Sequence, residues 1–234
     1  MGMVRAVARG LVGGAIAVLG LASCAGFEDV PMPTKAIGMA YNLPKPDGSG
    51  HDQPPGFFVR SATSVRWSDE PIVIPKAIER IDYEGELVVV IGKRARRVTP
   101  EEAREHILGY TCGMDGTPQF FAADGERDVL RSTAGKSADG IAPVGPRVVR
   151  DLAPEGHPII LRVNGEIVER AHTKDLVWDP ARIVSEISQT ITLEPGDVIF
   201  CGARQAIPKL EDGDTVEVEI EGIGRLIRSV VAEK

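Results

Sequence analysis

Runs of β-branched and alternating residues dominate this sequence and constrain its fold more than any other feature. Ile81–Gly92 is rich in valine and ends at a glycine, and Val216–Glu221 alternates apolar with acidic residues, as half-buried strands do. Pro158–Arg170 surrounds the pair Asn164-Gly165, a strong hairpin signal. The predicted helices are too few to connect every pair of strands, so the pattern favours an α+β fold with a mixed, largely antiparallel sheet.

Two short helices are predicted from their N-terminal signals. Thr99-Pro100-Glu101-Glu102 combines an N-cap threonine, a first-turn proline and the glutamate of a capping box, and Gly109 is expected to end this helix. The second helix is expected to begin at Asp179-Pro180. It would bury three apolar residues at helical spacing, namely Ile183, Val184 and Ile187.

The N-terminal segment is interpreted as a lipoprotein signal peptide rather than as part of the fold. Arg5 and Arg9 precede an apolar stretch, Gly10–Leu21, that is too short to span a bilayer as a mature helix. Leu21-Ala22-Ser23-Cys24 resembles the lipobox of bacterial lipoproteins, in which the cysteine is acylated and becomes the new N-terminus. The alternative is a buried helix or a misassigned start codon followed by a chance cysteine.

These patterns predict a division of the chain and a location in the cell. We expect residues 1–23 to be the signal peptide, residues 24–34 a tether and residues 35–234 the folded domain. Several acyl chains at Cys24 would hold the protein stably at the membrane of the cell envelope. A cytoplasmic protein is the alternative.

Charge and cysteine content exclude two further classes of protein. With 27 Lys and Arg against 34 Asp and Glu, the net charge is −7, so the summed field repels phosphate backbones and no nucleic-acid partner is expected. The three cysteines are too far apart for a metal-knuckle pattern or a disulfide framework. We expect Cys112 and Cys201 to be buried thiols.

Three carboxylates are candidates for a metal site. Glu84 and Glu86 lie two residues apart in a predicted strand, so their side chains share a face. On a buried face, two adjacent carboxylates take up a proton or share a hard divalent cation such as Mg²⁺, Mn²⁺ or Ca²⁺. Spacing alone favours the simpler arrangement in which both face water. Asp115, after a short apolar segment, could complete a set of three oxygen ligands.

Five blocks of the sequence resemble, in order and spacing, the fumarylacetoacetate hydrolase family. They are Asp82–Lys93 (DYEGELVVVIGK), Gly109–Asp115 (GYTCGMD), Gly135–Pro146 (GKSADGIAPVGP), Val163–Glu166 (VNGE) and Thr192–Gly202 (TLEPGDVIFCG). The resemblance implies a mixed β-sandwich roll with few short helices, usually a homodimer, and a catalytic domain over residues 35–234. It also implies that Glu84, Glu86 and Asp115 bind Mg²⁺ or Mn²⁺.

The same resemblance identifies candidate residues around the metal. Lys136 stands at the position of the family's active-site lysine, whose ammonium can neutralise a substrate carboxylate or enolate; considered alone, it could equally pair with Asp139 at the surface. Three other positions depart from the family: Arg60 replaces a lysine, Gln119 an arginine and Arg204 a proline. We regard these three as candidate substrate-binding residues.

The family's water-activating His/Glu dyad is absent from this chain. Pro44 stands at the position of the histidine and Asp47, a shorter carboxylate, at that of the glutamate. His51, followed by Asp52, lies a few residues downstream and could substitute if the loop folds back, so it is a candidate catalytic residue. The alternative is that His51 is an ordinary solvent-exposed loop histidine.

The function expected from these parts is a metal-dependent hydrolase or lyase for a small oxo-acid such as an acylpyruvate, oxaloacetate or a related enol-keto acid. A divalent ion can chelate the adjacent oxygens of such an acid and stabilise its enolate. With a water-activating base the outcome is C–C hydrolysis, and without one it is decarboxylation, tautomerisation or isomerisation. The alternative is an envelope-anchored ligand-binding protein that kept the fold and lost turnover.

Overall fold

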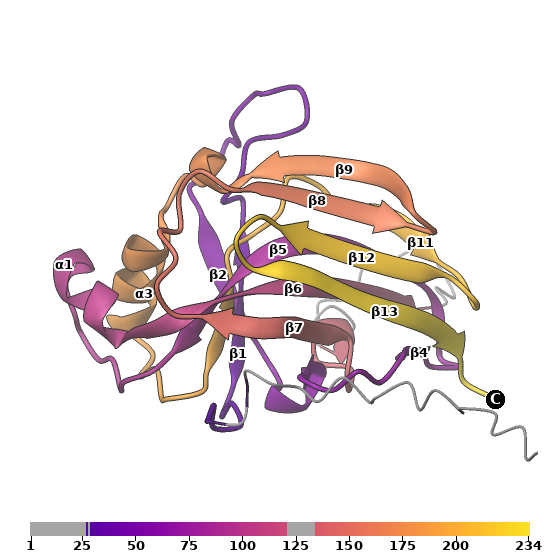
Figure 1. Cartoon of the computed structure of the whole chain (residues 1–234), viewed down its shortest axis with the longest axis horizontal. Helices are drawn as coiled ribbons and strands as arrows, with labels where there is room; N and C mark the ends of the chain where they lie inside the picture. The colour runs from indigo at the N-terminus through magenta and orange to yellow at the C-terminus, as the bar shows by residue number, and fades with distance from the viewer. Residues whose placement is uncertain (1–26, 28, 121–133) are drawn as a thin grey trace, which may run out of the picture.

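The computed structural model describes residues 27, 29–120 and 134–234, which form two curled, packed β-sheets with short helices at one end (Figure 1). The predicted signal peptide and Cys24 lie outside these residues. Within the described part of the chain, no helix has the length and apolar character needed to cross a membrane.

The larger sheet contains eight strands in the order β2-β1-β10-β5-β6-β7-β3, with β11 paired to β5. Its strands are β1 (Ala36–Ala40), β2 (Gly56–Arg60), β3 (Val65–Arg66), β5 (Ile78–Ile91), β6 (Ile107–Phe120), β7 (Ala142–Val149), β10 (Val198–Phe200) and β11 (Ile207–Leu210). The β1–β10 and β3–β7 pairs are parallel and the other pairs are antiparallel. The mixed, largely antiparallel sheet expected from the sequence is therefore confirmed.

The smaller sheet contains five strands in the order β4-β13-β12-β8-β9. They are β4 (Ile72–Ile74), β8 (Pro158–Val163), β9 (Glu166–His172), β12 (Thr215–Ile220) and β13 (Gly224–Ala232). The predicted hairpin at Asn164-Gly165 is confirmed as β8–β9, because both turn residues have the positive φ that such a turn requires. The alternation in β12 is also confirmed, since Val216, Val218 and Ile220 are fully buried.

The helices are short, as expected. The helices that lie wholly within the described residues are α1 (Pro100–Ala103) and α3 (Pro180–Ser188), with 3₁₀ turns η1 (Ala62–Ser64), η2 (Arg104–His106) and η3 (Thr173–Asp175). The capping box of α1 is confirmed: Thr99 Oγ1 accepts the N–H of Glu102, and Glu102 Oε2 accepts the N–H of Thr99. Asp179 caps α3, as predicted.

The prediction that Gly109 ends the first helix is wrong. The 3₁₀ turn η2 ends at His106, and Gly109 lies within β6, paired with Val90 of β5. A Cβ at Gly109 would lie 2.4 Å from the carbonyl oxygen of Val149, so the close approach of β7 requires glycine there. The glycine thus permits sheet packing rather than terminating a helix.

The long strand β5 separates an apolar core from the face that carries the acidic residues. A Cβ at Gly85 would lie 3.3 Å from Leu161 of β8 and Val218 of β12, so Gly85 and its odd-numbered neighbours face the smaller sheet. The even-numbered residues, including Glu84 and Glu86, face the opposite side. Cys112 and Cys201 are buried free thiols, as expected.

Candidate metal centre

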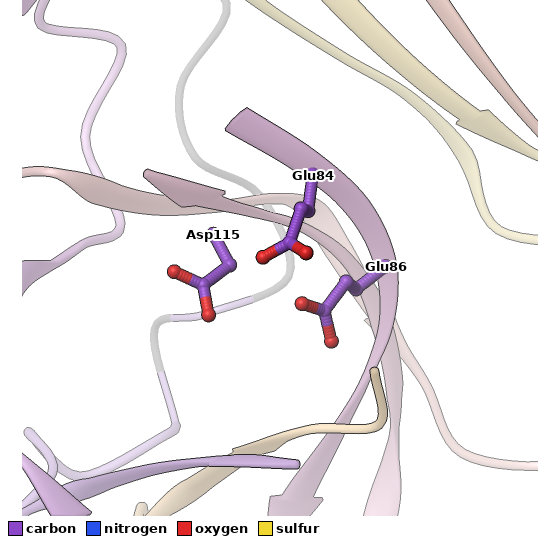
Figure 2. Close-up of side chains that lie close together, drawn as sticks. All are labelled: Glu84, Glu86 and Asp115. Carbon is purple, nitrogen blue, oxygen red and sulfur yellow. The ribbon is translucent and has the colours of Figure 1, made fainter. Parts of the chain in front are cut away.

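Three carboxylates converge on the face of the larger sheet that points away from the smaller one. Glu84 and Glu86 project from β5, and Asp115 projects from β6 toward the same point (Figure 2). Their nearest ligand oxygens all lie within 4.8 Å of one another. The sequence prediction that brought these three residues together therefore agrees with the geometry.

The register between β5 and β6 produces this convergence. Asp115 is the direct antiparallel partner of Glu84, and Gly113 is the partner of Glu86. Because Gly113 has no side chain, Val88 and Phe200 pack where its Cβ would lie, at 2.3 Å and 2.7 Å. Gly113 therefore places no side chain opposite Glu86, and Asp115 is the β6 residue whose carboxylate joins the two glutamates.

The loop after β10 closes over Glu86. The backbone N–H of Gly202 donates to Oε2 of Glu86, whose side chain is almost completely buried. Gly202 has φ +101°, which favours glycine, and a Cβ there would lie 3.1 Å from Cβ of Asn42. Asn42 donates to the carbonyl oxygen of Cys201 at 2.8 Å and also contacts the backbone of Trp178. Asn42 thereby fixes the loop that holds Glu86.

Two cations contact the same oxygen of Asp115. Lys136 Nζ lies 2.8 Å from Oδ1 of Asp115 and 3.6 Å from Oε2 of Glu84. Arg60 Nη1 lies 2.9 Å from the same Oδ1 as an ion pair, but the geometry is not that of a hydrogen bond. Sequence reasoning placed Lys136 at the site, and the structure does so too.

The protein environment opposes full ionisation of the two glutamates. Burial, followed by the charge of Asp115, raises the pKa of Glu84 to about 7, although Lys136 and Arg60 act in the opposite direction. Burial, Asp115 and Glu84 raise the pKa of Glu86 well above its ordinary value, against the hydrogen bond from Gly202. The cluster therefore holds protons or attracts a cation.

The donor set fits a hard divalent ion. All three ligand groups are carboxylates, which suit Mg²⁺, Mn²⁺ or Ca²⁺ better than softer metals. The residues that could hold the ion are Glu84, Glu86 and Asp115, and three carboxylates leave positions for water and substrate oxygens. This geometry favours the metal-binding interpretation over a pair of solvated acids.

The other predicted site residues occupy different surroundings. Arg60 is almost completely buried and donates to the carbonyl oxygens of Lys136 and Gly116. Gln119 lies on β6 and donates to Oδ2 of Asp82 at 3.1 Å. Arg204 pairs with Oδ2 of Asp175 at 3.1 Å. Of these three candidates, only Arg60 contacts a residue of the acidic cluster within the described chain.

The loop that carries His51 folds back on itself. The Nε2 atom of His51 lies 2.9 Å from the carbonyl oxygen of Leu43, and its ring contacts that of Tyr41 at 5.0 Å. Asp47 is exposed and accepts the N–H of Ser49. Across residues 29–120 and 134–234, no hydrogen bond or ion pair joins His51 to the three carboxylates.

Sequence reasoning missed two contributors to the site, Asn42 and Gly202, which fix the loop over Glu86. It also missed a buried acid outside the three-carboxylate cluster. Glu169 of β9 is buried, its Oε1 lacks a hydrogen-bond partner among the described residues, and burial raises its pKa to about 7. Nothing in the local pattern around Glu169 indicated this burial.

Known proteins resemble this chain in sequence. The profile of the fumarylacetoacetate (FAA) hydrolase C-terminal family matches residues 34–231. A bifunctional isomerase/decarboxylase of 4-hydroxyphenylacetate degradation from Salmonella dublin is 36% identical over 183 residues, which are 77% of this chain and 42% of that longer protein.

Two solved structures show the same fold. The 5-carboxymethyl-2-hydroxymuconate delta-isomerase from Mycobacterium smegmatis superposes with a TM-score of 0.78 and 34% identity, over 87% of this chain and 80% of that one. The maleylpyruvate hydrolase from Sphingobium sp. SYK-6, solved with manganese(II) and pyruvate, gives a TM-score of 0.73 and 27% identity, over 87% of this chain and 72% of that one.

Proposed function

Because the chain belongs to the fumarylacetoacetate hydrolase C-terminal family, we propose that it is a divalent-metal-dependent enzyme acting on a small oxo-acid. The relatives named above comprise an isomerase, an isomerase/decarboxylase and a hydrolase, so the family likeness supports an enzyme and leaves the reaction class open.

The observation that supports this proposal most strongly is the convergence of three carboxylates beside a lysine. Glu84, Glu86 and Asp115 offer oxygen ligands within 4.8 Å, and Lys136 Nζ lies 2.8 Å from Asp115. A divalent ion held there would act as a Lewis acid toward the two adjacent oxygens of an α-oxo acid and stabilise its enolate.

The residues of the chain supply the remaining functions. Lys136 places an ammonium beside the cluster, 2.8 Å from Oδ1 of Asp115, and such a cation can neutralise a carboxylate or enolate oxygen. Gly202 and Asn42 hold Glu86 and its loop in place, so the ligand positions are fixed before substrate binds. Phe58, whose ring centroid lies 5.1 Å from Lys136 Nζ, helps to position that ammonium.

We propose decarboxylation or enol–keto isomerisation rather than efficient C–C hydrolysis. Among the described residues, no hydrogen bond or ion pair joins His51 to the three carboxylates. Its Nε2 atom lies 2.9 Å from the carbonyl oxygen of Leu43 instead. Enolate stabilisation does not require that base. An acylpyruvate, oxaloacetate or a related enol-keto acid is the substrate class that this combination fits.

Turnover assays with and without metal test the proposal. The purified protein, stripped with EDTA, would be given oxaloacetate, an acylpyruvate and an enol-keto acid, each with and without Mn²⁺. We expect Mn²⁺-dependent loss or tautomerisation of at least one substrate. If no substrate is turned over but pyruvate binds in the presence of Mn²⁺, the ligand-binding alternative is favoured. If there is neither turnover nor binding, both the enzyme and the ligand-binding proposals are refuted.

We also propose that the protein is a homodimer anchored by lipid at Cys24. The family resemblance supports the dimer, and the lipobox-like string supports the anchor and thus the cell envelope. The described domain is compatible with an N-terminal attachment, because Asp197 accepts hydrogen bonds from the backbone of Thr34 and Lys35 and so fixes the chain where it enters β1. Sedimentation analysis of the mature protein tests the dimer.

A further inference from the structure

The ammonium of Lys136 contacts two of the three carboxylates of the acidic cluster. Its Nζ is 2.8 Å from Oδ1 of Asp115 and 3.6 Å from Oε2 of Glu84, two of the three groups that converge in Figure 2. A monovalent side-chain cation and a divalent ion would therefore compete for the same two carboxylates.

The two cations at Asp115 differ in their freedom to move. Arg60 is 1% exposed, and it donates to the backbone carbonyl oxygens of Lys136 and Gly116, so it is fixed on three sides. The Lys136 side chain is 17% exposed, and apart from the carboxylates its ammonium has the ring of Phe58 as a neighbour. A flexible four-carbon stem lets such an ammonium shift by several ångströms, whereas the buried guanidinium of Arg60 is held by two backbone carbonyl oxygens.

A divalent ion added to this set would repel both cations. Once the three carboxylates are ionised, as metal ligation requires, they sum to −1 with Arg60 and Lys136, and the ion would lie close to the lysine ammonium. Like charges at such a separation repel strongly where water is partly excluded. Only Lys136 has the exposure and flexibility to relieve that repulsion.

We propose that Lys136 is a built-in counter-ion that occupies the metal position in the metal-free protein and leaves Asp115 when a divalent ion binds. This inference rests on the proposed metal-dependent function. The released ammonium is then free to bind an anionic substrate, so the metal must bind before the substrate. Metal binding thus releases the Lys136 ammonium, which then becomes available to bind an anion.

Calorimetric titration with Mn²⁺ tests the competition directly. We expect Lys136→Met to bind Mn²⁺ at least about tenfold more tightly than the wild type, since a unit positive charge near the ion has been removed from a partly buried site. Lys209→Met is the matched control, because Lys209 is exposed and pairs with Glu211 alone among the described residues, yet it changes the net charge equally. The control should titrate like the wild type.

Two further measurements separate this role from simple structural support. Thermal unfolding should show a larger Mn²⁺-induced rise in Tm for Lys136→Met than for the wild type, because its metal-free cluster lacks a counter-ion. Pyruvate, used as an anionic probe, should bind the Mn²⁺-loaded wild type. Its affinity should be lower for the metal-free wild type and for the Mn²⁺-loaded Lys136→Met protein.

The outcomes distinguish the inference from the function on which it depends. If the wild type binds no divalent ion, the proposed metal site itself fails. If the wild type binds Mn²⁺ and Lys136→Met binds it equally or more weakly, the counter-ion role alone is overturned. Should Lys136→Met not fold, Lys136→Gln provides the same loss of charge, and Lys136→Arg, which retains the charge, should show no gain in Mn²⁺ affinity.

Discussion

Glu84 on β5 and Asp115 on β6 are direct antiparallel partners, and this pairing brings ligands from two strands to one point. Neighbouring side chains on paired strands stand about 5 Å apart, so their carboxylates can share a cation. Glu86, two residues along the same face, adds the third oxygen donor. The site is therefore a property of strand register rather than of any single loop.

The first prediction concerns the ligands. Glu84→Gln combined with Glu86→Gln should abolish Mn²⁺ and Mg²⁺ binding in calorimetry, because two of three anionic donors become neutral amides. Glu217→Gln combined with Glu219→Gln is the matched control: these residues have the same spacing on β12, and they pair with Arg162 instead of facing the cluster. Equal titrations for the two double variants would end the metal hypothesis.

The second prediction is a pH dependence of stability in the metal-free protein. Glu84 has a pKa of about 7 in the folded protein against an ordinary value of 4.5, so between these values the folded state retains a proton that the unfolded chain has released. The free energy of unfolding should therefore fall by about 1–3 kcal/mol as the pH rises from 4.5 to about 7.

Urea titrations at several pH values in EDTA measure this fall. Mn²⁺ should reverse most of it, because a divalent ion compensates the ionised carboxylates. Glu169, whose pKa is also raised to about 7, should contribute a part that Mn²⁺ does not restore. A stability that rises with pH across this interval in EDTA would contradict the prediction.

The third prediction concerns Gly202. Substitution Gly202→Ala should destabilise the protein by about 1–3 kcal/mol, the usual cost of a side chain in a left-handed backbone conformation, and it should weaken Mn²⁺ binding by displacing the N–H that holds Glu86. Gly213→Ala separates the two effects, since Gly213 has φ +91° and open space around its Cβ position. It should lose stability without losing metal affinity.

The fourth prediction concerns the missing dyad. Acylpyruvate hydrolysis should be slower by about 10²–10⁴-fold than in a relative that carries the His/Glu pair, which is the usual contribution of a positioned general base. Oxaloacetate decarboxylation or tautomerisation should survive and vanish with EDTA or with Asp115→Asn. If wild-type hydrolysis proves fast and collapses in His51→Ala, then His51 has replaced the dyad and the prediction is wrong.

The fifth prediction concerns the N-terminal segment. Expression in a bacterial host should yield a membrane-associated form whose mass includes acyl chains on Cys24, and Cys24→Ser should leave the unprocessed precursor. Detergent partitioning and intact mass distinguish these products. A water-soluble product that begins at Met1 would refute the lipoprotein interpretation.

The sequence was sufficient to predict which residues share a face, because alternation within one strand is a local property. The spacing of Glu84 and Glu86 was enough to predict that their side chains share a face. The hairpin at Asn164-Gly165 followed from turn chemistry. Burial of that face could not be inferred in this way. It depends on how far the sheet curls and on the loop that Gly202 and Asn42 bring over it.

Arg60 and Gly109 both have contacts that the local sequence does not reveal. The structure buries Arg60 against Asp115 and the carbonyl oxygen of Lys136, contacts that come from distant parts of the chain, and its role in substrate binding stays a prediction. Gly109 was read as the end of a helix, whereas the nearby carbonyl oxygen of Val149 explains the glycine. Neither partner is visible in the neighbouring sequence.

All three proposed metal ligands come from β5 and β6, two strands that follow one another along the chain, whereas Arg60, Lys136 and Arg204 come from outside that stretch. The ligand set can therefore be inherited as one contiguous block of a gene. Substitutions and insertions elsewhere can change the surroundings of the carboxylates without disturbing that block. This arrangement gives a lineage a way to diversify around the cluster while the cluster itself stays constant.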